Sequence, residues 1–288
     1  MRLACAALLL GSCASAPGGR GLLESVTFYA SFDEEIRGDA GGGEMRPSTR
    51  YNHKTEKGAF VVEKGAPEKA FRIAAGKGIA GGALEAVDVL PDNGRLYFPA
   101  KGNIAFRRGG WGGTLSLWIR FDPDTQLKTK FCDPVQITQK GAGNGGIWFD
   151  FNDAKPHRNM RMGAFPSVPA GQPNLQESRE ASSPMVWVDR PGLHADDWHH
   201  VAIVWENFDT GRKDARAAFF LDGRPMGEVR DKDYPISMDW DLEKAGIYVA
   251  VSYIGFLDEL ALFDRPLPAE ELDRLRAEPG LLRRLKRP

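Results

Sequence analysis

The chain has 288 residues, of which 42% are hydrophobic and 27% are charged, and its formal net charge is -1. This composition predicts a soluble globular protein with enough apolar residues for a substantial core. A charge so close to neutral argues against a nucleic-acid partner, which requires a basic surface. The 33 glycines and 19 prolines indicate many turns rather than long helices.

The N-terminal segment predicts export. Met1-Arg2 supplies a positive start, and the apolar run that follows it to Leu10 is too short to span a bilayer. Leu10-Gly11-Ser12-Cys13 resembles a bacterial lipobox, in which Cys13 would be acylated after cleavage before it. Ala14-Ser15-Ala16 is an alternative cleavage signal, which would give a secreted protein instead. We therefore expect a signal and tether over 1–20, membrane contact only through a lipid anchor, and one domain over 21–288.

Short strands are predicted through the rest of the chain. Leu22–Phe32 is the first, and a Gly-rich, charged loop follows from Asp33 to about Gly58. Thr114–Phe121 shows the clearest period-two alternation, directly after a predicted turn around Trp111. Further strands are predicted over 58–62, 71–73, 84–87, 95–99, 134–139, 146–152, 160–165, 185–188, 199–205, 217–221, 225–229, 248–251 and 256–263. Roughly fourteen short strands with frequent turns indicate an all-β sandwich rather than βαβ units.

Only the C-terminal end is predicted to be helical. Pro268 suits a first helical position, and Glu270-Glu271 suit the positive end of the helix dipole. Leu272 and Leu275 give the segment an apolar stripe with helical spacing. The sequence therefore predicts a two-sheet antiparallel β-sandwich that ends in a short helix.

The order of several sequence pieces resembles a known family. Gly113–Arg120 and Ile137–Gly141 are two of these pieces, and Trp198-His199-His200-Val201-Ala202 through Leu221-Asp222-Gly223 is the strongest. The last is Gly255–Leu260 through Phe263–Leu267. Together they resemble the laminin-G-like, or concanavalin A-like lectin/glucanase, family. The resemblance implies a jelly roll that is usually a sugar-binding or adhesion module and only sometimes an enzyme.

The same resemblance implies a structural calcium site near the point where the first strand meets the last. Asp258 matches the aspartate of the family's closing strand, and Asp33 and Asp39 are candidate partners. Hard oxygen ligands on flexible loops suit Ca²⁺. In the alternative interpretation, Asp258 and Glu259 cap loops or pair with Arg265.

A polar face on the middle strands is the candidate glycan site. Trp148, Asp150 and Asn152 alternate with apolar residues, and a neighbouring strand could add Asn159 and Arg161. An aromatic ring beside amides, a carboxylate and an arginine offers a sugar both stacking and planar hydrogen bonds. The alternative is an ordinary solvent-facing sheet.

Catalysis has weaker support in the sequence. Glycosidases need two carboxyl groups across the scissile bond, and the family's hydrolases place them on a Glu-x-Asp-x-Glu strand. Glu271-Leu272-Asp273 is the nearest string, and it lies on the predicted helix. We therefore expect a non-catalytic carbohydrate-binding module at the cell envelope. The alternatives are an adhesion module that binds a cell-surface protein, and a glycoside hydrolase or polysaccharide lyase with an unrecognised site.

Overall fold

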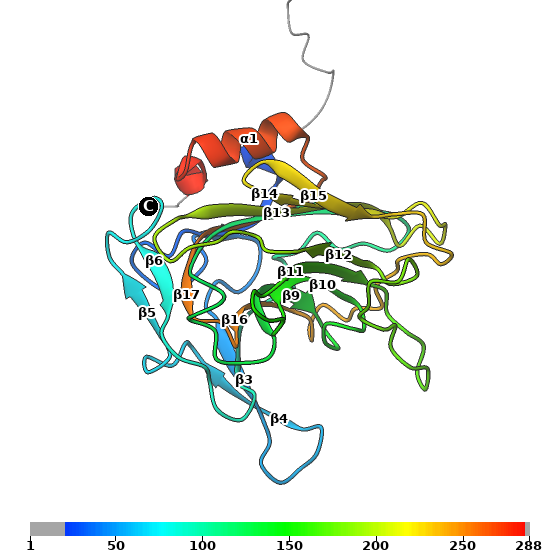
Figure 1. Ribbon diagram of the computed structural model, residues 1–288, viewed down its shortest axis with the longest axis horizontal. Coiled ribbons are helices and arrows are strands. Elements are labelled where there is room, and N and C mark those ends of the chain that lie inside the picture. Colours follow the sequence, from blue (N-terminus) through cyan, green and yellow to red (C-terminus); the bar gives the residue numbers. More distant parts are fainter. Residues whose placement is uncertain (1–20, 286–288) are drawn as a thin grey trace, which may run out of the picture.

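The computed structural model describes residues 21–285, so the predicted signal and Cys13 lie outside the described part of the chain. Two antiparallel sheets stack face to face, and helix α1 (Ala269–Ala277) lies across the outer side of one of them (Figure 1). The predicted all-β sandwich with a short C-terminal helix is therefore confirmed.

One sheet has nine strands in the order β15-β14-β13-β8-β17-β1-β2, with β6 pairing β17 and β5 pairing β6. Its strands are β1 (Val26–Ala30), β2 (Ala40–Gly41), β5 (Phe71–Ala74), β6 (Ala83–Ala86), β8 (Trp111–Arg120), β13 (His199–Phe208), β14 (Arg216–Leu221), β15 (Arg224–Val229) and β17 (Gly255–Phe263). The other sheet has eight strands in the order β12-β11-β10-β9-β16-β7-β3-β4. These are β3 (Ser48–Asn52), β4 (Phe60–Lys64), β7 (Arg95–Pro99), β9 (Cys132–Thr138), β10 (Gly146–Phe151), β11 (Met160–Phe165), β12 (Met185–Val188) and β16 (Gly246–Val251).

The main core fills the space between the two sheets. Alternate residues of the central strands point into it, as in β8, where Leu115, Leu117 and Ile119 are fully buried. β8 begins earlier than predicted, because Trp111 is a strand residue rather than the centre of a turn. Its indole packs on Trp205 at a centroid distance of 5.1 Å, and burying such a ring favours continuing the strand.

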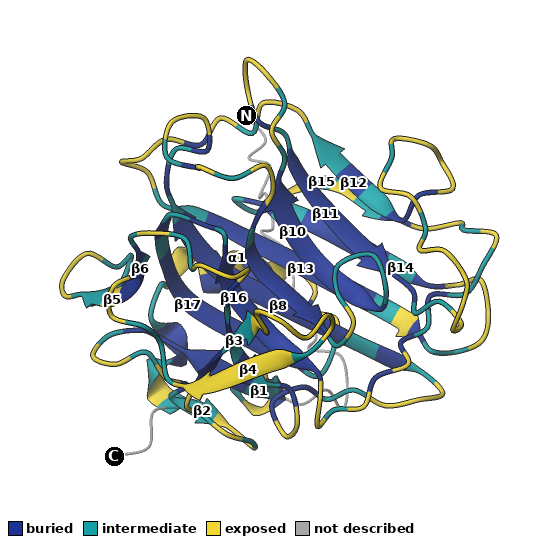
Figure 2. Cartoon of the chain, turned by 90° about the horizontal axis from the view of Figure 1, so that it is seen from below, coloured by how far each residue is buried: buried dark blue, intermediate teal, exposed yellow. Residues whose placement is uncertain are grey.

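The predicted loop from Asp33 to Gly58 is wrong in part, because β2 and β3 lie within it. β3 pairs with β7, so that Arg50 is opposite Arg95, and with β4 on its other side. This pairing joins segments far apart in sequence, and local patterning does not reveal it. β4 is left as an exposed edge strand (Figure 2).

A smaller core lies between the nine-stranded sheet and the C-terminal segment. Leu272 and Leu275 of α1 pack there with Leu281 and Leu282 of the 3-10 helix η2 (Leu281–Leu285) and with Leu22. Pro268 flanks α1 as its N-cap rather than serving as its first residue. Within residues 21–285 no helix is both long and apolar enough to cross a membrane.

Candidate functional site

The outer face of the eight-stranded sheet carries the predicted glycan-binding residues. Ile147, Phe149 and Phe151 of β10 belong to the core, so the intervening Trp148 and Asp150 point away from it. Asp150 is opposite Arg161 of β11, and Arg161 is opposite Trp187 of β12. The strand register thus brings Trp148, Asp150 and Arg161 together on one face.

These residues bond mainly to one another. The Nε of Arg161 donates to Asp150 Oδ1 at 2.8 Å, a second guanidinium nitrogen donates to Asp150 Oδ2, and a third lies 3.1 Å from Glu177 Oε2. The rings of Trp148, Trp187 and Phe131 surround the guanidinium at 5.0 to 5.6 Å. Burial raises the pKa of Asp150 to about 6, although Arg161 opposes the rise. This half of the face is a buried, internally paired ion cluster.

The other predicted residues hold local structure. Trp148 is only 1% exposed, and its Nε1 donates to the carbonyl of Ala142 at 2.9 Å. Its ring lies so close to Gly163 that a Cβ there would be 2.4 Å away. The Oδ1 of Asn152 accepts from the backbone N–H of Asn159 at 3.1 Å and so closes the turn between β10 and β11. Trp148 is therefore buried and the amide oxygen of Asn152 is already hydrogen-bonded, so neither is available to a ligand as placed.

A row of planar side chains crosses the rest of the same face. Trp148 is opposite Gln136, Gln136 is opposite Tyr248, and Tyr248 is opposite Tyr97. The two tyrosine rings are 5.3 Å apart, and Tyr97 is half-buried. The Oε1 of Gln136 is buried without a hydrogen-bond partner among the described residues. This row was not predicted from the sequence, although Gln136 and Tyr97 alternate with core residues of their strands.

An arginine pair, Arg50 and Arg95, lies beside this row. Both side chains are half-buried, and their positions are directly opposite each other across β3 and β7. The Arg50 guanidinium lies 4.2 Å from the ring centre of Phe60 and 5.1 Å from that of Tyr248. The Nε of Arg95 is buried without an acceptor. Burial and the charge of Arg50 lower the pKa of Arg95.

Asp133 of β9 is the acidic neighbour of both halves of the face. Burial and the negative charge of Asp150 raise its pKa well above the ordinary range, while the charges of Arg95 and Arg161 oppose that rise. Its side chain forms no hydrogen bond or ion pair within residues 21–285. A recessed carboxyl group that holds its proton can donate a hydrogen bond to a ligand oxygen.

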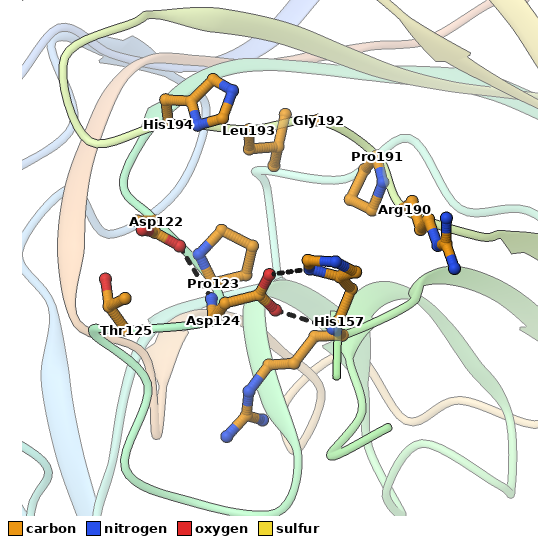
Figure 3. Close-up of a pocket in the computed structure, with 11 residues that line it drawn as sticks. Asp122, Pro123, Asp124, Thr125, His157, Arg190, Pro191, Gly192, Leu193 and His194 are labelled. Carbon is orange, nitrogen blue, oxygen red and sulfur yellow. Dashed lines mark hydrogen bonds and ion pairs between the residues drawn. The ribbon is translucent and has the colours of Figure 1, made fainter. Parts of the chain in front are cut away.

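A separate pocket lies among the loops at one end of the sandwich (Figure 3). It has a volume of about 370 Å³ and is bounded by the loop after β8, the turn between β10 and β11, and the segment after β12. In it Asp124 Oδ2 lies 2.7 Å from Nδ1 of His157, and Asp124 Oδ1 accepts from the backbone N–H of Arg158 at 2.7 Å. Burial would raise the pKa of Asp124, but these bonds together lower it. Arg190 and His194 line the opposite side.

The predicted calcium ligands lie at the other sheet, with Asp258 in β17 and with Asp33 and Asp39 in the loop between β1 and β2. Asp258 is fully buried, and its carboxylate accepts from the backbone N–H groups of Ala80 at 3.3 Å and Glu259 at 2.8 Å. Asp39 accepts from the N–H of Ser31, and Asp33 accepts from that of Gly82. These carboxylates therefore already serve as backbone acceptors.

A guanidinium group provides the positive charge in this region. Arg283 of η2 lies 2.5 Å from Asp33 Oδ1 and 3.4 Å from Glu259 Oε1. Burial raises the pKa of Asp258 to about 8 and that of Glu259 to about 7. Across residues 21–285 no group of three or more His, Cys, Asp or Glu side chains is arranged to hold a metal ion. With Arg283 in this position the carboxylates do not fit Ca²⁺, and calcium binding stays a prediction.

Solved structures resemble this fold at low sequence identity. The receptor binding domain of a botulinum neurotoxin C/D mosaic serotype aligns with 90% of this chain at 11% identity and a TM-score of 0.54, and this chain spans 52% of that one. Domain 4 of AbnA, a GH43 extracellular arabinanase from Geobacillus stearothermophilus solved with arabinotriose, aligns with 88% of this chain and 98% of its own at 16% identity and a TM-score of 0.48. The first likeness shows a shared fold.

No curated protein matches this chain. A family model does: the concanavalin A-like lectin/glucanases superfamily matches residues 98–273, which include β8 to β17 and most of α1. The match covers more than half of the sequence, and the two-sheet antiparallel sandwich agrees with it. The chain belongs to the concanavalin A-like lectin/glucanases superfamily.

Proposed function

We propose that this protein is a non-catalytic carbohydrate-binding module whose glycan lies on the outer face of the eight-stranded sheet. One observation carries the proposal: this face holds sugar-binding side-chain types whose polar atoms are not used within the described chain. Arg95, on the same strand as Tyr97, has a buried nitrogen without a partner, and Gln136, on the far side of Tyr248, has a buried oxygen without one. Buried polar atoms are normally paired, and sugar hydroxyl groups would supply the missing partners once the side chains that cover these atoms shift on binding.

The family and the fold support the same function. Domain 4 of the arabinanase was solved with arabinotriose, and a CBM40 from Ruminococcus gnavus with sialyllactose. Those ligands belong to those proteins, and their TM-scores of 0.48 and 0.41 are too low to transfer a site. The location that we propose therefore rests on this chain's own residues.

A binding assay with two tyrosine variants tests this location. Tyr97→Ala removes a half-exposed ring from the proposed face, whereas Tyr51→Ala removes a ring of the neighbouring β3 that lies opposite Val61. We expect Tyr97→Ala to weaken retention in polysaccharide-containing gels by about tenfold, which corresponds to about 1.4 kcal/mol of binding free energy. Tyr51→Ala should retain the wild-type affinity. Equal effects of the two variants, at equal thermal stability, would exclude this face.

The pKa values of two neighbouring carboxyl groups favour a hydrolase or lyase as the second candidate. Asp133 and Asp150 both have raised pKa values, which is what general acid catalysis near neutral pH requires. Asp150 is held by Arg161, so Asp133 is the better candidate for the acid. Loss of polymer length with purified protein, abolished by Asp133→Asn, would establish catalysis. Unchanged polymer length across a broad glycan panel would exclude catalysis and leave binding as the proposed function.

The exposed edge strand favours an adhesion module as a further alternative. Phe60, Val61 and Val62 of β4 are 43 to 52% exposed, and their strand has a free edge in the sheet. Exposed apolar edge strands can pair with another chain. Capture of a cell-surface protein that is lost in Val61→Lys would support this function over glycan binding.

A further inference from the structure

The arginine pair is a like-charge contact that the described chain does not neutralise. Arg50 and Arg95 are directly opposite each other in antiparallel strands, where like charges destabilise the pairing. Within residues 21–285 neither side chain forms a hydrogen bond or an ion pair with another residue. Asp133 is the acidic group whose charge acts on Arg95, and burial favours the protonated form of that carboxyl. The pair therefore retains an excess of positive charge.

Several other recessed arginines of this chain do have carboxylate partners, although Arg120 and Arg158 do not. Arg161 is bidentate to Asp150, Arg216 contacts both Glu206 and Glu228, and Arg265 is bidentate to Glu271. Buried guanidinium groups are costly unless they are paired in this way. Unlike these three arginines, Arg50 and Arg95 have no carboxylate partner, and they lie directly opposite each other. An external anion would supply the missing partner.

The surroundings of the pair suit a sugar that carries the anion. Phe60 and Val62 beside Arg50 are 49% and 52% exposed, and the Tyr97 ring is also accessible. Aromatic faces pack on the apolar side of a sugar ring, and a planar guanidinium matches a carboxylate in a bidentate geometry. A free inorganic anion would use the charges but not these rings.

We propose that Arg50 and Arg95 bind the carboxylate of an acidic sugar, so that the ligand is a carboxylated polysaccharide packed on Tyr97 and Phe60. This inference rests on the proposed function, since it names the class of glycan that the same face would take. The carboxylate lies between the two guanidinium groups and offsets their repulsion. Neutral polymers of the same backbone lack the group that makes this contact.

Two polymers with one backbone test the chemistry of the ligand. We expect full-length protein to bind polygalacturonate at least tenfold more tightly than its fully methyl-esterified form, and added salt should weaken only the first interaction. Dextran sulfate measures attraction to anions in general, and sodium acetate measures binding of a free carboxylate. Equal affinity for dextran sulfate and polygalacturonate would overturn the assignment to carboxylate.

Arginine variants test the location. Arg50→Gln and Arg95→Gln should each weaken polygalacturonate binding at least tenfold and change binding of the ester by less than twofold. Arg72→Gln is the matched control, because this arginine is exposed on the other sheet and paired with Glu85. The melting temperature of the ligand-free protein should stay equal or rise in both test variants, since a repulsion is removed. A purely structural role would instead lower it.

The outcomes separate the two proposals. If the protein binds neutral polymers, and Tyr97→Ala weakens that binding while the arginine variants do not alter any affinity, the glycan face stands and the acidic-sugar assignment is overturned. If it binds no polymer in a broad panel that includes polygalacturonate, both proposals are overturned. Selective loss of acidic-polymer binding in the arginine variants supports both.

Discussion

Replacing Arg161 by methionine should destabilise the protein strongly, because it breaks a buried ion cluster. Arg161 and Asp150 side chains are 3% and 5% exposed, and removing one partner of such a pair costs about 3–5 kcal/mol. Unfolding roughly 265 described residues changes the entropy by about 0.6 kcal/mol/K, so the melting temperature should fall by about 5–9 K. Methionine keeps much of the contact with Trp148 and Trp187, so lost packing contributes little.

The pH dependence of this destabilisation distinguishes a charge effect from a packing effect. Without the guanidinium, the pKa of Asp150 rises further above its unfolded value of about 3.9. A raised pKa gives stability that is present below the unfolded value and is lost as the pH rises through the folded value. Urea melts of Arg161→Met and wild type should therefore differ least near pH 4 and most near pH 8. A small difference in melting temperature that does not vary with pH would refute the buried ion cluster. Arg179→Met, which removes an exposed arginine beside Trp187, is the control.

Three further predictions concern the other sheet and the N-terminal segment. The pKa values of Asp258 and Glu259 are raised to about 8 and about 7 by burial, so stability should fall as the pH rises from about 6 to 9, and Asp258→Asn should flatten that fall in urea melts. If the stability of the variant falls with pH as steeply as that of the wild type, this assignment to Asp258 is wrong. Because Arg283 occupies the position of a counter-ion to Asp33, Arg283→Gln should bind Ca²⁺ more tightly than wild type in calorimetry, and equal affinities would argue against a calcium site there. Cys13→Ser should abolish labelling by a fatty acid in bacterial cells and release the protein from membranes; persistent membrane association would contradict a lipid anchor through Cys13.

The architecture was readable from the sequence where strands bury alternate residues. β8 and β10 show this, because their apolar positions repeat with period two and face the core. β3 was missed, because its stability comes from pairing with β7 and β4 rather than from its own pattern. Its neighbours in sequence are glycine-rich and charged, which are the features of a loop.

The candidate site was only partly predictable for a similar reason. Alternation places Trp148 and Asp150 on one face, but their burial depends on side chains from other segments, such as Glu177 and Phe131. Arg95 is prominent only once β3 brings Arg50 opposite to it. The pairing of β3 with β7 and the lack of an acceptor for Arg95 arise only in the folded chain, and no local sequence motif encodes them.

The position of the small core under α1 also determines how a tethered molecule would be oriented. Leu22, close to the predicted tether, packs with Leu272 and Leu282 on the outer side of the nine-stranded sheet. The arginine pair lies on the opposite side of the sandwich. A molecule anchored through the predicted tether would therefore turn the proposed glycan-binding face away from the membrane. The anchor and the proposed binding face would lie on opposite sides of the sandwich, so the membrane would not block access of a polymer to that face.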